Sequence, residues 1–559
     1  MRWFTWRRTV VSCLLSLCCA AELETRQSSK GSAQLPANDD FIRRSLLSVA
    51  VLGDYVYIDG GEVGSELDKS RSTAVSLTLS IPLDESWTND TVVFTESEKG
   101  PSPCLKQPAL WVDDERSTIY SWGGQGSYNN ASAAGDHHLY AFENDSDGKG
   151  SWSIHDPEDD TLFSSLYRTV RGAYTTCHGV GYYLGGYGER RTDDRFTDGS
   201  YVERPLDGLL TYNMTTQKWT NESTKALDYA TWSGKATCIP SIGSSGLLIF
   251  MGGAKVKMPA FGNVSDPVSF TNITIYDPSS KEWYYQQTSG VSPDPRVEFC
   301  SVGVQGPNST YEIFIYGGWN TWNDKTKSFD DVWVLSLPAF KWFKADVEGP
   351  KRGMHGCALV GKRQMLSIGG NKWGKDEGWR DKDPWTQGIG ILDLPSLTWS
   401  SEYDADAQEY ESPKVVRDWY QRGNKVKWDN DDVTRLFASM SATTPGSTDG
   451  RILNPYSSDS SSTPVGAIAG GVVGGVAGIV ALIGVWLWMR RRKRNTSKQP
   501  PEAGDGGDTK QWGKAELSAD NSKQSGLQEL ESNQGPAELP VATPPLERNG
   551  QTQRHELEG

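Results

Sequence analysis

A Gly-Gly pair that closes a short apolar run recurs six times in this sequence, and it constrains the fold more than any other feature. The pairs are Gly60-Gly61, Gly123-Gly124, Gly185-Gly186, Gly252-Gly253, Gly317-Gly318 and Gly369-Gly370. Successive pairs begin 63, 62, 67, 65 and 52 residues apart. Each pair is followed by a long loop, a second apolar run and a tryptophan: Trp87, Trp152, Trp219, Trp283, Trp342 and Trp399. Self-similarity at this spacing predicts a repeat architecture between Phe41 and Trp399.

Each repeat is predicted to form about four short antiparallel strands, because its apolar runs are bounded by glycine and polar loops. Such a unit cannot bury both faces alone, whereas stacking several units around an axis buries the faces and leaves only short edges. Glycines after the second strand permit a positive φ and a close approach of the backbone. The tryptophan fills the wide gap between neighbouring units. We therefore expect an all-β, six-bladed β-propeller over residues 41–405.

The repeats resemble the kelch repeat, in which a Gly-Gly pair follows an aliphatic and aromatic strand and precedes a Tyr-Asp or similar turn and a tryptophan. The clearest copies are Ile313 to Trp342, which contains Phe329-Asp330-Asp331-Val332-Trp333, and Ile249 to Trp283, which contains Tyr276-Asp277-Pro278. Most spacings exceed the roughly 50 residues usual for kelch repeats, so several loops are enlarged. The resemblance implies a propeller that serves as a binding module, as most kelch propellers do.

The propeller is flanked by segments typical of a single-pass membrane protein. Residues 1–21 match a secretory signal peptide, in which Arg2, Arg7 and Arg8 lead into the apolar run Thr9 to Cys19 and Ala20-Ala21 supply a cleavage site. An uncleaved anchor is the alternative. Residues 465–489 carry no charge and are long enough to cross a bilayer as a transmembrane helix. The basic cluster from Arg490 to Arg494 is expected on the cytoplasmic side. The predicted topology is type I, with the N-terminus extracellular or lumenal, in the plasma membrane or the secretory pathway, and this layout resembles fungal single-pass membrane proteins with kelch repeats.

Composition assigns the remaining segments. Residues 22–40 form an N-terminal segment before the propeller. Residues 406–440 are predicted to form a short helical extension of two helices that pack against the propeller rim. Residues 441–464 are rich in Ser, Thr, Pro and Gly, which is typical of an extended, O-glycosylated stalk. Residues 490–559 are polar and rich in Pro, Gly, Gln and Glu, so we expect a disordered cytoplasmic tail.

Five cysteines remain once the predicted signal peptide is removed, and they follow the period of the repeats. They are Cys104, Cys177, Cys238, Cys300 and Cys357, each expected in the strand before a Gly-Gly strand. An odd number leaves at least one thiol unpaired or paired between chains. We expect small buried residues here rather than disulfides, because equivalent positions in separate blades rarely approach to the 4.4–6.8 Å between Cα atoms that a bridge needs. Disulfides are the alternative.

Charge and residue types limit the classes of function. The formal net charge of -15 argues against a nucleic-acid partner, which would favour a basic surface. A few kelch propellers, such as galactose oxidase, are enzymes, and that resemblance would imply a copper site of two histidines and two tyrosines, one of them cross-linked to a cysteine. The predicted ectodomain holds His137, His138, His155, His178 and His355. Only His137 and His138 are neighbours, and in a strand they would point to opposite faces. We therefore predict no catalytic residue, metal or cofactor, and the oxidase is the alternative.

The long loops after Gly186, Gly318 and Gly370 carry aromatic and charged residues on what should be one face of the disc. The predicted ligand-binding residues are Tyr187, Arg190, Arg191, Trp319, Trp322, Trp373 and Trp379. Aromatic and arginine side chains are favoured at interface hot spots, and flat rings also stack on sugars. This pattern favours an extracellular protein or glycan ligand. The alternatives are that the rings pack under their own loops as small satellite cores, and that the protein is a structural surface sensor or adhesion protein.

Two further expectations concern modification and assembly. Sequons for N-glycosylation stand at Asn89, Asn130, Asn144, Asn213, Asn221, Asn263, Asn272 and Asn308, all before the predicted membrane span. Asn495 also has a sequon but should remain bare on the cytoplasmic side. Gly466, Gly470, Gly474 and Gly478 recur every four residues, which predicts a homodimer through the transmembrane helix. General glycine richness of membrane helices is the alternative.

Overall fold

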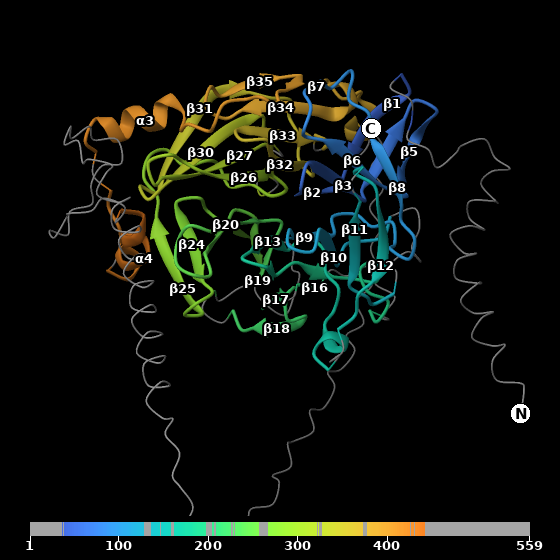
Figure 1. Ribbon diagram of the computed structural model, residues 1–559, viewed down its shortest axis with the longest axis horizontal. Helices are drawn as coiled ribbons and strands as arrows, with labels where there is room; N and C mark the ends of the chain where they lie inside the picture. The colour runs from blue at the N-terminus through green and yellow to red at the C-terminus, as the bar shows by residue number, and fades with distance from the viewer. Residues whose placement is uncertain are drawn as a thin grey trace, which may run out of the picture. The chain divides into compact units, whose positions relative to one another are not determined.

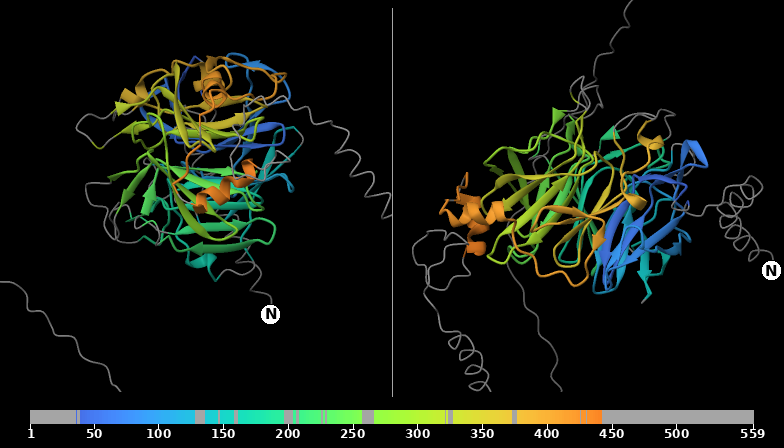
Figure 2. Two further views of the ribbon diagram at one scale, coloured as in Figure 1. Left: turned by 90° about the vertical axis from the view of Figure 1, so that its left-hand side faces the viewer. Right: turned by 90° about the horizontal axis from the view of Figure 1, so that it is seen from above.

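The computed structural model (Figures 1 and 2) shows an all-β body with short helices at its C-terminal end. It describes Pro36 and residues 39–441, except 128–135, 146, 158–160, 197–203, 206–207, 225–226, 228–229, 257–265, 321, 323–326, 373–376, 425 and 430. The predicted signal peptide, transmembrane helix and cytoplasmic tail, and the stalk beyond Ser441, lie outside the described residues. Among the described residues, no helix is long and apolar enough to cross a membrane.

In the described part of the chain, six four-stranded antiparallel sheets make up the body. Sheet 1 contains β2 (Ser48–Leu52), β3 (Tyr55–Asp59), β6 (Leu77–Pro82) and β8 (Thr95–Glu98). Sheet 2 contains β9 (Ala109–Asp113), β10 (Thr118–Trp122), β11 (Tyr140–Asn144) and β12 (Gly150–Ile154). Sheet 3 contains β13 (Ala173–Cys177), β14 (Val180–Leu184), β17 (Leu209–Asn213) and β18 (Lys218–Glu222). Sheet 4 contains β20 (Lys235–Ile239), β21 (Leu247–Met251), β24 (Asn272–Asp277) and β25 (Glu282–Gln287). Sheet 5 contains β26 (Cys300–Gln305), β27 (Tyr311–Tyr316), β30 (Asp331–Leu337) and β31 (Lys341–Glu348). Sheet 6 contains β32 (Gly356–Val360), β33 (Gln364–Ile368), β34 (Ile389–Asp393) and β35 (Thr398–Ser400).

The first strands of the sheets surround a common axis. Each first strand contacts the first strand of the next sheet, and β32 of the last sheet contacts β2 of the first. In Figure 1 the blue strands of sheet 1 lie beside the yellow and orange strands of sheet 6, which are farthest from them in the chain. This closed arrangement is that of a β-propeller, as the repeats predict.

Smaller sheets and short helices decorate the body. The small sheets contain β1 (Phe41–Ser45), β4 (Glu62–Ser65) and β5 (Asp68–Ala74); β19 (Ala230–Trp232), β22 (Ala254–Val256) and β23 (Asp266–Pro267); β15 (Tyr187–Gly188) and β16 (Arg204–Pro205); β28 (Trp319–Asn320) and β29 (Lys327–Ser328); and β7 (Trp87–Thr88) and β36 (Glu402–Tyr403). The helices within the described ranges are η1 (Phe163–Ser165), α2 (Glu377–Arg380), η3 (Thr386–Gly388), α3 (Lys414–Gln421) and α4 (Asp431–Ser441). The last two occupy the segment after the propeller: Tyr420 of α3 hydrogen-bonds to Ser336, and Phe437 of α4 packs on Phe340 with ring centroids 5.0 Å apart.

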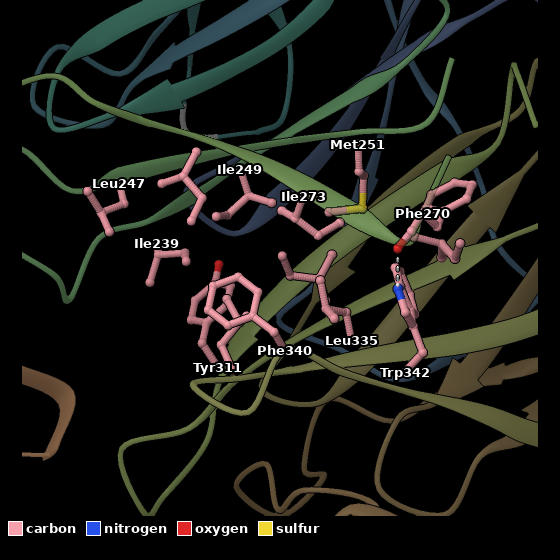
Figure 3. Close-up of a cluster of buried hydrophobic side chains, with 14 of the residues drawn as sticks. Ile239, Leu247, Ile249, Met251, Phe270, Ile273, Tyr311, Leu335, Phe340 and Trp342 are labelled. Carbon is pink, nitrogen blue, oxygen red and sulfur yellow. Dashed lines mark hydrogen bonds between the residues drawn. The ribbon is translucent and has the colours of Figure 1, made fainter. Parts of the chain in front are cut away.

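The repeat tryptophans hold neighbouring sheets together. Trp342 of β31 is 2% exposed and its Nε1 donates to the Phe270 carbonyl, 2.9 Å away, in the segment before β24 (Figure 3). Trp152 of β12 donates in the same way to Thr78 of sheet 1, at 2.8 Å. Each indole therefore joins its own sheet to the preceding one, and Trp342 lies in a buried cluster that contains residues of sheets 4 and 5.

Trp87 departs from this pattern. It lies on β7 rather than on the fourth strand of sheet 1, and β7 pairs with β36, the last of the described strands. Its ring stacks on Tyr403 with centroids 5.2 Å apart. This tryptophan thus fastens the C-terminal end of the propeller to sheet 1 on the outside of the ring.

The Gly-Gly pairs are required by close backbone approaches. At Gly317 φ is 68°, and a Cβ atom there would lie 2.5 Å from the Arg352 carbonyl oxygen of the next repeat. At Gly318 φ is 93°, and a Cβ atom would lie 2.7 Å from the Val297 carbonyl oxygen. Both conditions exclude a side chain, as the sequence predicts.

The expectation that the cysteines stay unbridged is wrong for four of them. Cys177 pairs with Cys238, and Cys300 pairs with Cys357, with Cα atoms 5.6 and 5.7 Å apart. Each bridge joins the first strands of adjacent sheets, β13 to β20 and β26 to β32. Blades diverge outward, but their first strands converge on the axis, so equivalent positions there come within bridging distance. Cys104 also departs from the pattern, because it lies in the loop before β9 rather than in a strand.

Candidate binding site

The propeller has two unlike faces. The hairpin face carries the turns that join the first strand to the second and the third to the fourth. The loop face carries the Gly-Gly pairs and the segments that follow them. On the loop face, the segment after each pair bonds to the segment that leads into the same sheet. Examples are β1 with β4, β19 with β22, and Val297 with Trp319.

A ring of six left-handed residues surrounds the axis at the loop face. Each stands two residues before the first strand of its sheet: Leu46, Gln107, Arg171, Ser233, Glu298 and Met354, with φ between 49° and 64°. Successive members are joined by backbone hydrogen bonds, in which Leu46 donates to Met354, Gln107 to Leu46, Ser233 to Arg171, Glu298 to Ser233 and Met354 to Glu298. The N···O distances lie between 2.6 and 3.3 Å, so the ring is narrow.

Four side chains of this ring meet on the axis. Glu298 accepts hydrogen bonds from Gln107 at 2.7 Å and from Ser233 at 2.8 Å, and Arg171 pairs with it at 3.0 Å. Arg171 and Glu298 are not adjacent in the ring, so their contact crosses it. We call Gln107, Arg171, Ser233 and Glu298 the axial plug. Since Glu298 and Ser233 are buried, the plug closes the central channel at the loop face.

An apolar cluster lies on the loop face beside the plug. Trp319 is buried with Ala254 and Val297, and the half-buried side chains of Trp232, Trp322 and Met354 pack against it. Arg171 of the plug lies 5.7 Å from the centroid of the Trp232 ring, within range of a cation–π contact. We call Trp232, Trp319, Trp322 and Met354 the loop-face cluster. It presents large apolar side chains to solvent above a polar, hydrogen-bonded support.

The predicted ligand-binding residues fall into two groups. Tyr187, Trp319 and Arg191 are 0%, 4% and 9% exposed, and Arg191 pairs with buried Glu189 at 2.7 Å, so these three pack beneath their own loops. Trp322 and Trp379 are half-buried and Arg190 is exposed, whereas Trp373 lies outside the described residues. The structure brings Tyr187, Trp319 and Trp322 to the region of the plug. Trp379 lies elsewhere, beside Gly64 of β4.

Charged groups are buried beneath the loop face. Burial lowers the pKa of Lys106 to about 7, although Glu62 lies 3.8 Å away. Asp383 is buried between Arg43 and Arg352, at 3.4 and 3.0 Å. These pairs link loops of different sheets, and their buried carboxylates and cations satisfy one another rather than a ligand.

Sequence reasoning missed Trp232, Met354 and the plug. The six ring residues are of six different types, and none of them is glycine, asparagine or aspartate, the residues that usually mark a left-handed position in a sequence. The signal that could have found them is positional: each precedes the first strand of its sheet by two residues.

The histidines are placed in several different surroundings. His137 bonds to the Phe163 carbonyl at 2.9 Å, His138 to Asp156 at 2.6 Å and His178 to the Pro240 carbonyl at 3.0 Å. His355 is buried beside Cys300 and Cys357, which are bonded to each other. Burial holds the pKa of His355 well below its ordinary value, so its imidazole is neutral at physiological pH.

The sequons also differ in their surroundings. Asn221 and Asn272 are exposed, Asn144, Asn213 and Asn308 are half-buried, and Asn130, Asn263 and Asn495 lie outside the described residues. Asn89 is 5% exposed, and its Nδ2 donates to the Ile389 carbonyl at 2.9 Å.

We expect Asn89 to remain unmodified in the folded protein, whereas Asn221 and Asn272 carry glycans if the chain enters the secretory pathway as its sequence predicts. A glycan on Nδ2 of Asn89 would disrupt a buried hydrogen bond and has no room in the packed interior. Glycosidase treatment in ¹⁸O water followed by peptide mass spectrometry distinguishes the three sites. Full occupancy at Asn89 would contradict the packing described here.

Comparisons with known proteins agree with this architecture. No family model matches the chain. The chain is 25% identical over 407 residues to a kelch repeat-containing protein of Arthroderma benhamiae. The match covers 66% of this chain and 58% of the relative, so the chain spans less than two thirds of the relative's length. The Gly-Gly repeats, the ring of four-stranded sheets and this similarity together support a kelch-repeat β-propeller.

Proposed function

We propose that this chain is a single-pass surface protein whose six sheets are the blades of a kelch-type propeller, and that the propeller binds a protein ligand through its loop face. The observation that carries the proposal is the loop-face cluster. Trp232, Trp322 and Met354 keep part of their apolar surface in solvent while a buried Trp319 supports them.

The chemistry of the cluster suits a protein partner. Tryptophan and methionine are enriched at the centres of protein interfaces, where a few well-packed side chains supply most of the binding energy. The axial plug fixes the backbone beneath them, so little conformational entropy is lost on binding. A sugar would need polar groups beside the rings to fix its hydroxyls. Among the described residues, the side chain of Trp322 packs against an apolar cluster, and this packing favours a protein over a glycan.

The disulfides support an extracellular location for this surface. Bridges form and persist in oxidising compartments and are rare in the cytosol. The two disulfides of the described residues join neighbouring sheets at the axis. They agree with the signal peptide and type I topology that the sequence predicts.

Photo-crosslinking in cells tests the proposal. A photoreactive phenylalanine at position 322 of the full-length protein should give an adduct with one protein species, whereas the same residue at position 419 should not. Trp419 is a matched control, because it is also a half-buried tryptophan but lies on α3. The partner is then identified by mass spectrometry and produced separately.

Direct binding to that partner gives the decisive measurement. We expect Trp322→Ala or Trp232→Ala to weaken the affinity about tenfold or more, as loss of a hot-spot side chain does, and Trp419→Ala to leave it unchanged. Equal adducts at both positions would contradict the proposal, as would full affinity in the Trp322→Ala and Trp232→Ala variants. Adducts with glycans alone would assign the face to a sugar ligand instead.

A further inference from the structure

Cys300, His355 and Cys357 form a compact group close to the axial plug. Cys300 begins β26, two residues after Glu298 of the plug, and Cys357 lies on β32. One sulfur or nitrogen atom from each of the three residues lies within 4.8 Å of the other two. Thiolate sulfur and imidazole nitrogen are ligands that zinc prefers in proteins. The group therefore has the composition of a zinc site with three protein ligands.

The ring nitrogens of His355 are buried without a use in the fold. The side chain is 4% exposed, and among the described residues neither Nδ1 nor Nε2 has a partner in hydrogen-bonding geometry. The ring makes an edge-to-face contact with Tyr316, 5.2 Å between centroids, and the Tyr316 backbone also approaches it. A buried polar group without a partner costs free energy, which a metal ion bound to one nitrogen would offset.

The two sulfurs are bonded to each other in this structure, so a metal ion requires them to be reduced first. A dithiol can open the bridge: it is oxidised to its own disulfide, and the two cysteines become thiols. Zinc then displaces the two thiol protons. A tetrahedral zinc ion has bonds of about 2.3 Å to sulfur and about 2.0 Å to nitrogen, so its ligand atoms lie about 3.5–4 Å apart. Small side-chain rotations at Cys300 and Cys357 reach this spacing, because their Cα atoms are already 5.7 Å apart.

The charges around the group suit a zinc thiolate complex. Lys235 and Arg352 are close enough to act electrostatically on His355, and Arg352 is paired with Asp383 at 3.0 Å. Neighbouring cations favour the thiolate form of cysteine, which is the form that binds a metal. Zn²⁺ with two thiolates and an imidazole carries no net charge, so the complex avoids the cost of burying an isolated ion.

The central channel gives access to the group. Cys357 is half-buried and lines this cavity of about 780 Å³. The lining extends to the exposed residues Glu115 and His178 at the hairpin face. A hydrated ion can therefore approach Cys357 through the channel, and water there can occupy the fourth position of the tetrahedron.

We propose that Cys300, Cys357 and His355 bind one Zn²⁺ ion in the reduced protein, with water from the central channel as the fourth ligand. The disulfide and the ion are alternative states of the same two sulfurs, and each joins sheet 5 to sheet 6. The bridged state prevails in an oxidising compartment, and the zinc state belongs to the chain before the bridge closes or after it is reduced. The site is independent of the ligand proposed for the loop face.

The second disulfide is a matched control within the same chain. Cys177 and Cys238 also join first strands of adjacent sheets, with Cα atoms 5.6 Å apart, and both line the channel. In the described part of the chain, no third ligand completes a group with them. His178 follows Cys177 in the sequence, but its Nε2 bonds to the Pro240 carbonyl at 3.0 Å. This pair has the same thiol chemistry without the histidine.

Differential alkylation of the full-length protein tests the proposal. The protein is reduced with dithiothreitol, desalted without oxygen and treated with iodoacetamide in the presence or absence of Zn²⁺, and peptide mass spectrometry gives the rate at each cysteine. Zinc at ten times its Kd should slow the alkylation of Cys300 and Cys357 about tenfold, since only the unoccupied fraction reacts. Cys177 and Cys238 should react at unchanged rates. Mg²⁺, which prefers oxygen ligands, should protect none of the four.

Two variants assign the ligands. His355→Phe keeps an aromatic ring beside Tyr316 but removes the nitrogen, so zinc affinity should fall at least ten- to hundredfold, the cost of losing even an outer-shell partner of a metal site. Co²⁺ added to the reduced protein should give a sulfur-to-metal charge-transfer absorption, which Cys357→Ser should abolish. Cys177→Ser should leave this absorption unchanged.

Three outcomes would overturn the proposal. The first is equal protection of both cysteine pairs, which would mean that zinc binds any two thiols. The second is undiminished zinc affinity in His355→Phe. The third is the absence of protection at Cys300 and Cys357 in the unmodified protein, a measurement that needs no variant to fold. A reduced protein that unfolds and is not restored by zinc gives this third outcome, because a bound ion stabilises the folded state by mass action.

Discussion

Trp342→Ala should lower the free energy of unfolding by about 3–5 kcal/mol, the cost of removing a large buried aromatic side chain. The indole is 2% exposed and makes an edge-to-face contact with Phe270 at 5.6 Å between ring centroids. Its Nε1 also satisfies the Phe270 carbonyl in the neighbouring sheet. The substitution therefore removes packing between neighbouring sheets and one of the two hydrogen bonds to the Phe270 carbonyl, which keeps the one from the Thr288 hydroxyl at 2.9 Å. Urea denaturation of the purified protein measures the change, and the yield of folded protein should fall with it.

Trp322→Ala is the matched control for this prediction. Both residues are tryptophans, but Trp322 is half-buried on the loop face and packs at the edge of the loop-face cluster. We expect its loss to cost roughly 1 kcal/mol, because part of its surface is already in water and it packs at the edge of a cluster rather than between two sheets. If Trp342→Ala destabilised the protein no more than Trp322→Ala does, the role of the repeat tryptophans in holding blades together would be wrong.

The repeat pattern was sufficient to predict the body of the fold. The glycines of each pair have positive φ, and five of the six tryptophans lie on fourth strands, because both roles depend on residue type. Only glycine tolerates the approach at Gly318, and only a large ring fills the space at Trp342. Trp87 keeps its place in the sequence alternation but not in the sheet, since its strand pairs with β36 at the end of the chain. A pairing between residues more than 300 positions apart leaves no local signal.

The site was harder to predict for a related reason. The axial plug depends on the position of Gln107, Arg171, Ser233 and Glu298 around the axis, and their types share no pattern. The disulfides were misjudged because the sequence gives the separation along the chain, 61 and 57 residues, and not the convergence of first strands at the axis. Tyr187 and Trp319 are buried because their backbones form β-bridges with the segments that lead into their sheets, Tyr187 with Val170 and Trp319 with Val297. These bridges join residues that are distant in the sequence.

The C-terminal extension is fastened to sheet 5 through a buried carboxylic acid, Glu312 of β27. Glu312 is completely buried and accepts hydrogen bonds from Ser336 at 3.0 Å and from Tyr410 at 3.3 Å. Ser412 and Thr310 also lie against it, and Ser412 belongs to the extension. Three tyrosines are the titratable side chains around Glu312. Tyr311 is its neighbour on the same strand, Tyr410 of the extension bonds to it directly, and Tyr420 of the extension bonds to Ser336. Among the charged groups of the extension, Arg417 donates to the Ser412 carbonyl and to the carboxylate of Glu411.

Burial raises the pKa of Glu312 to about 7, which makes the attachment of the extension dependent on pH. When the extension is released, the carboxyl group meets water and its pKa returns to its ordinary value near 4.5. Below that value both states are protonated and the attachment has its full stability. As the pH rises from there to about 7, the released state loses its proton first, so the attached state is progressively destabilised. Above pH 7 the accumulated loss is roughly 3 kcal/mol, at 1.36 kcal/mol for each unit of pKa difference.

Glu312→Gln should remove this dependence. The amide is close to the carboxylic acid in shape and stays neutral, so the stability difference between pH 5 and pH 8 should shrink by roughly 3 kcal/mol relative to the unmodified protein. Urea denaturation and hydrogen exchange of residues 408–437, each at pH 5 and pH 8, measure the difference. In the unmodified protein, amides of this segment should exchange faster at pH 8 than the intrinsic pH dependence of the exchange reaction accounts for. In Glu312→Gln this excess should disappear. Glu348→Gln, at an exposed carboxylate on β31 of the same sheet, should keep the full pH dependence. All other titrating groups are common to the variants, so their contributions cancel in this comparison. If the stability of Glu312→Gln changed between pH 5 and pH 8 as much as that of the unmodified protein, Glu312 would be excluded as the titrating group that links the extension to the propeller.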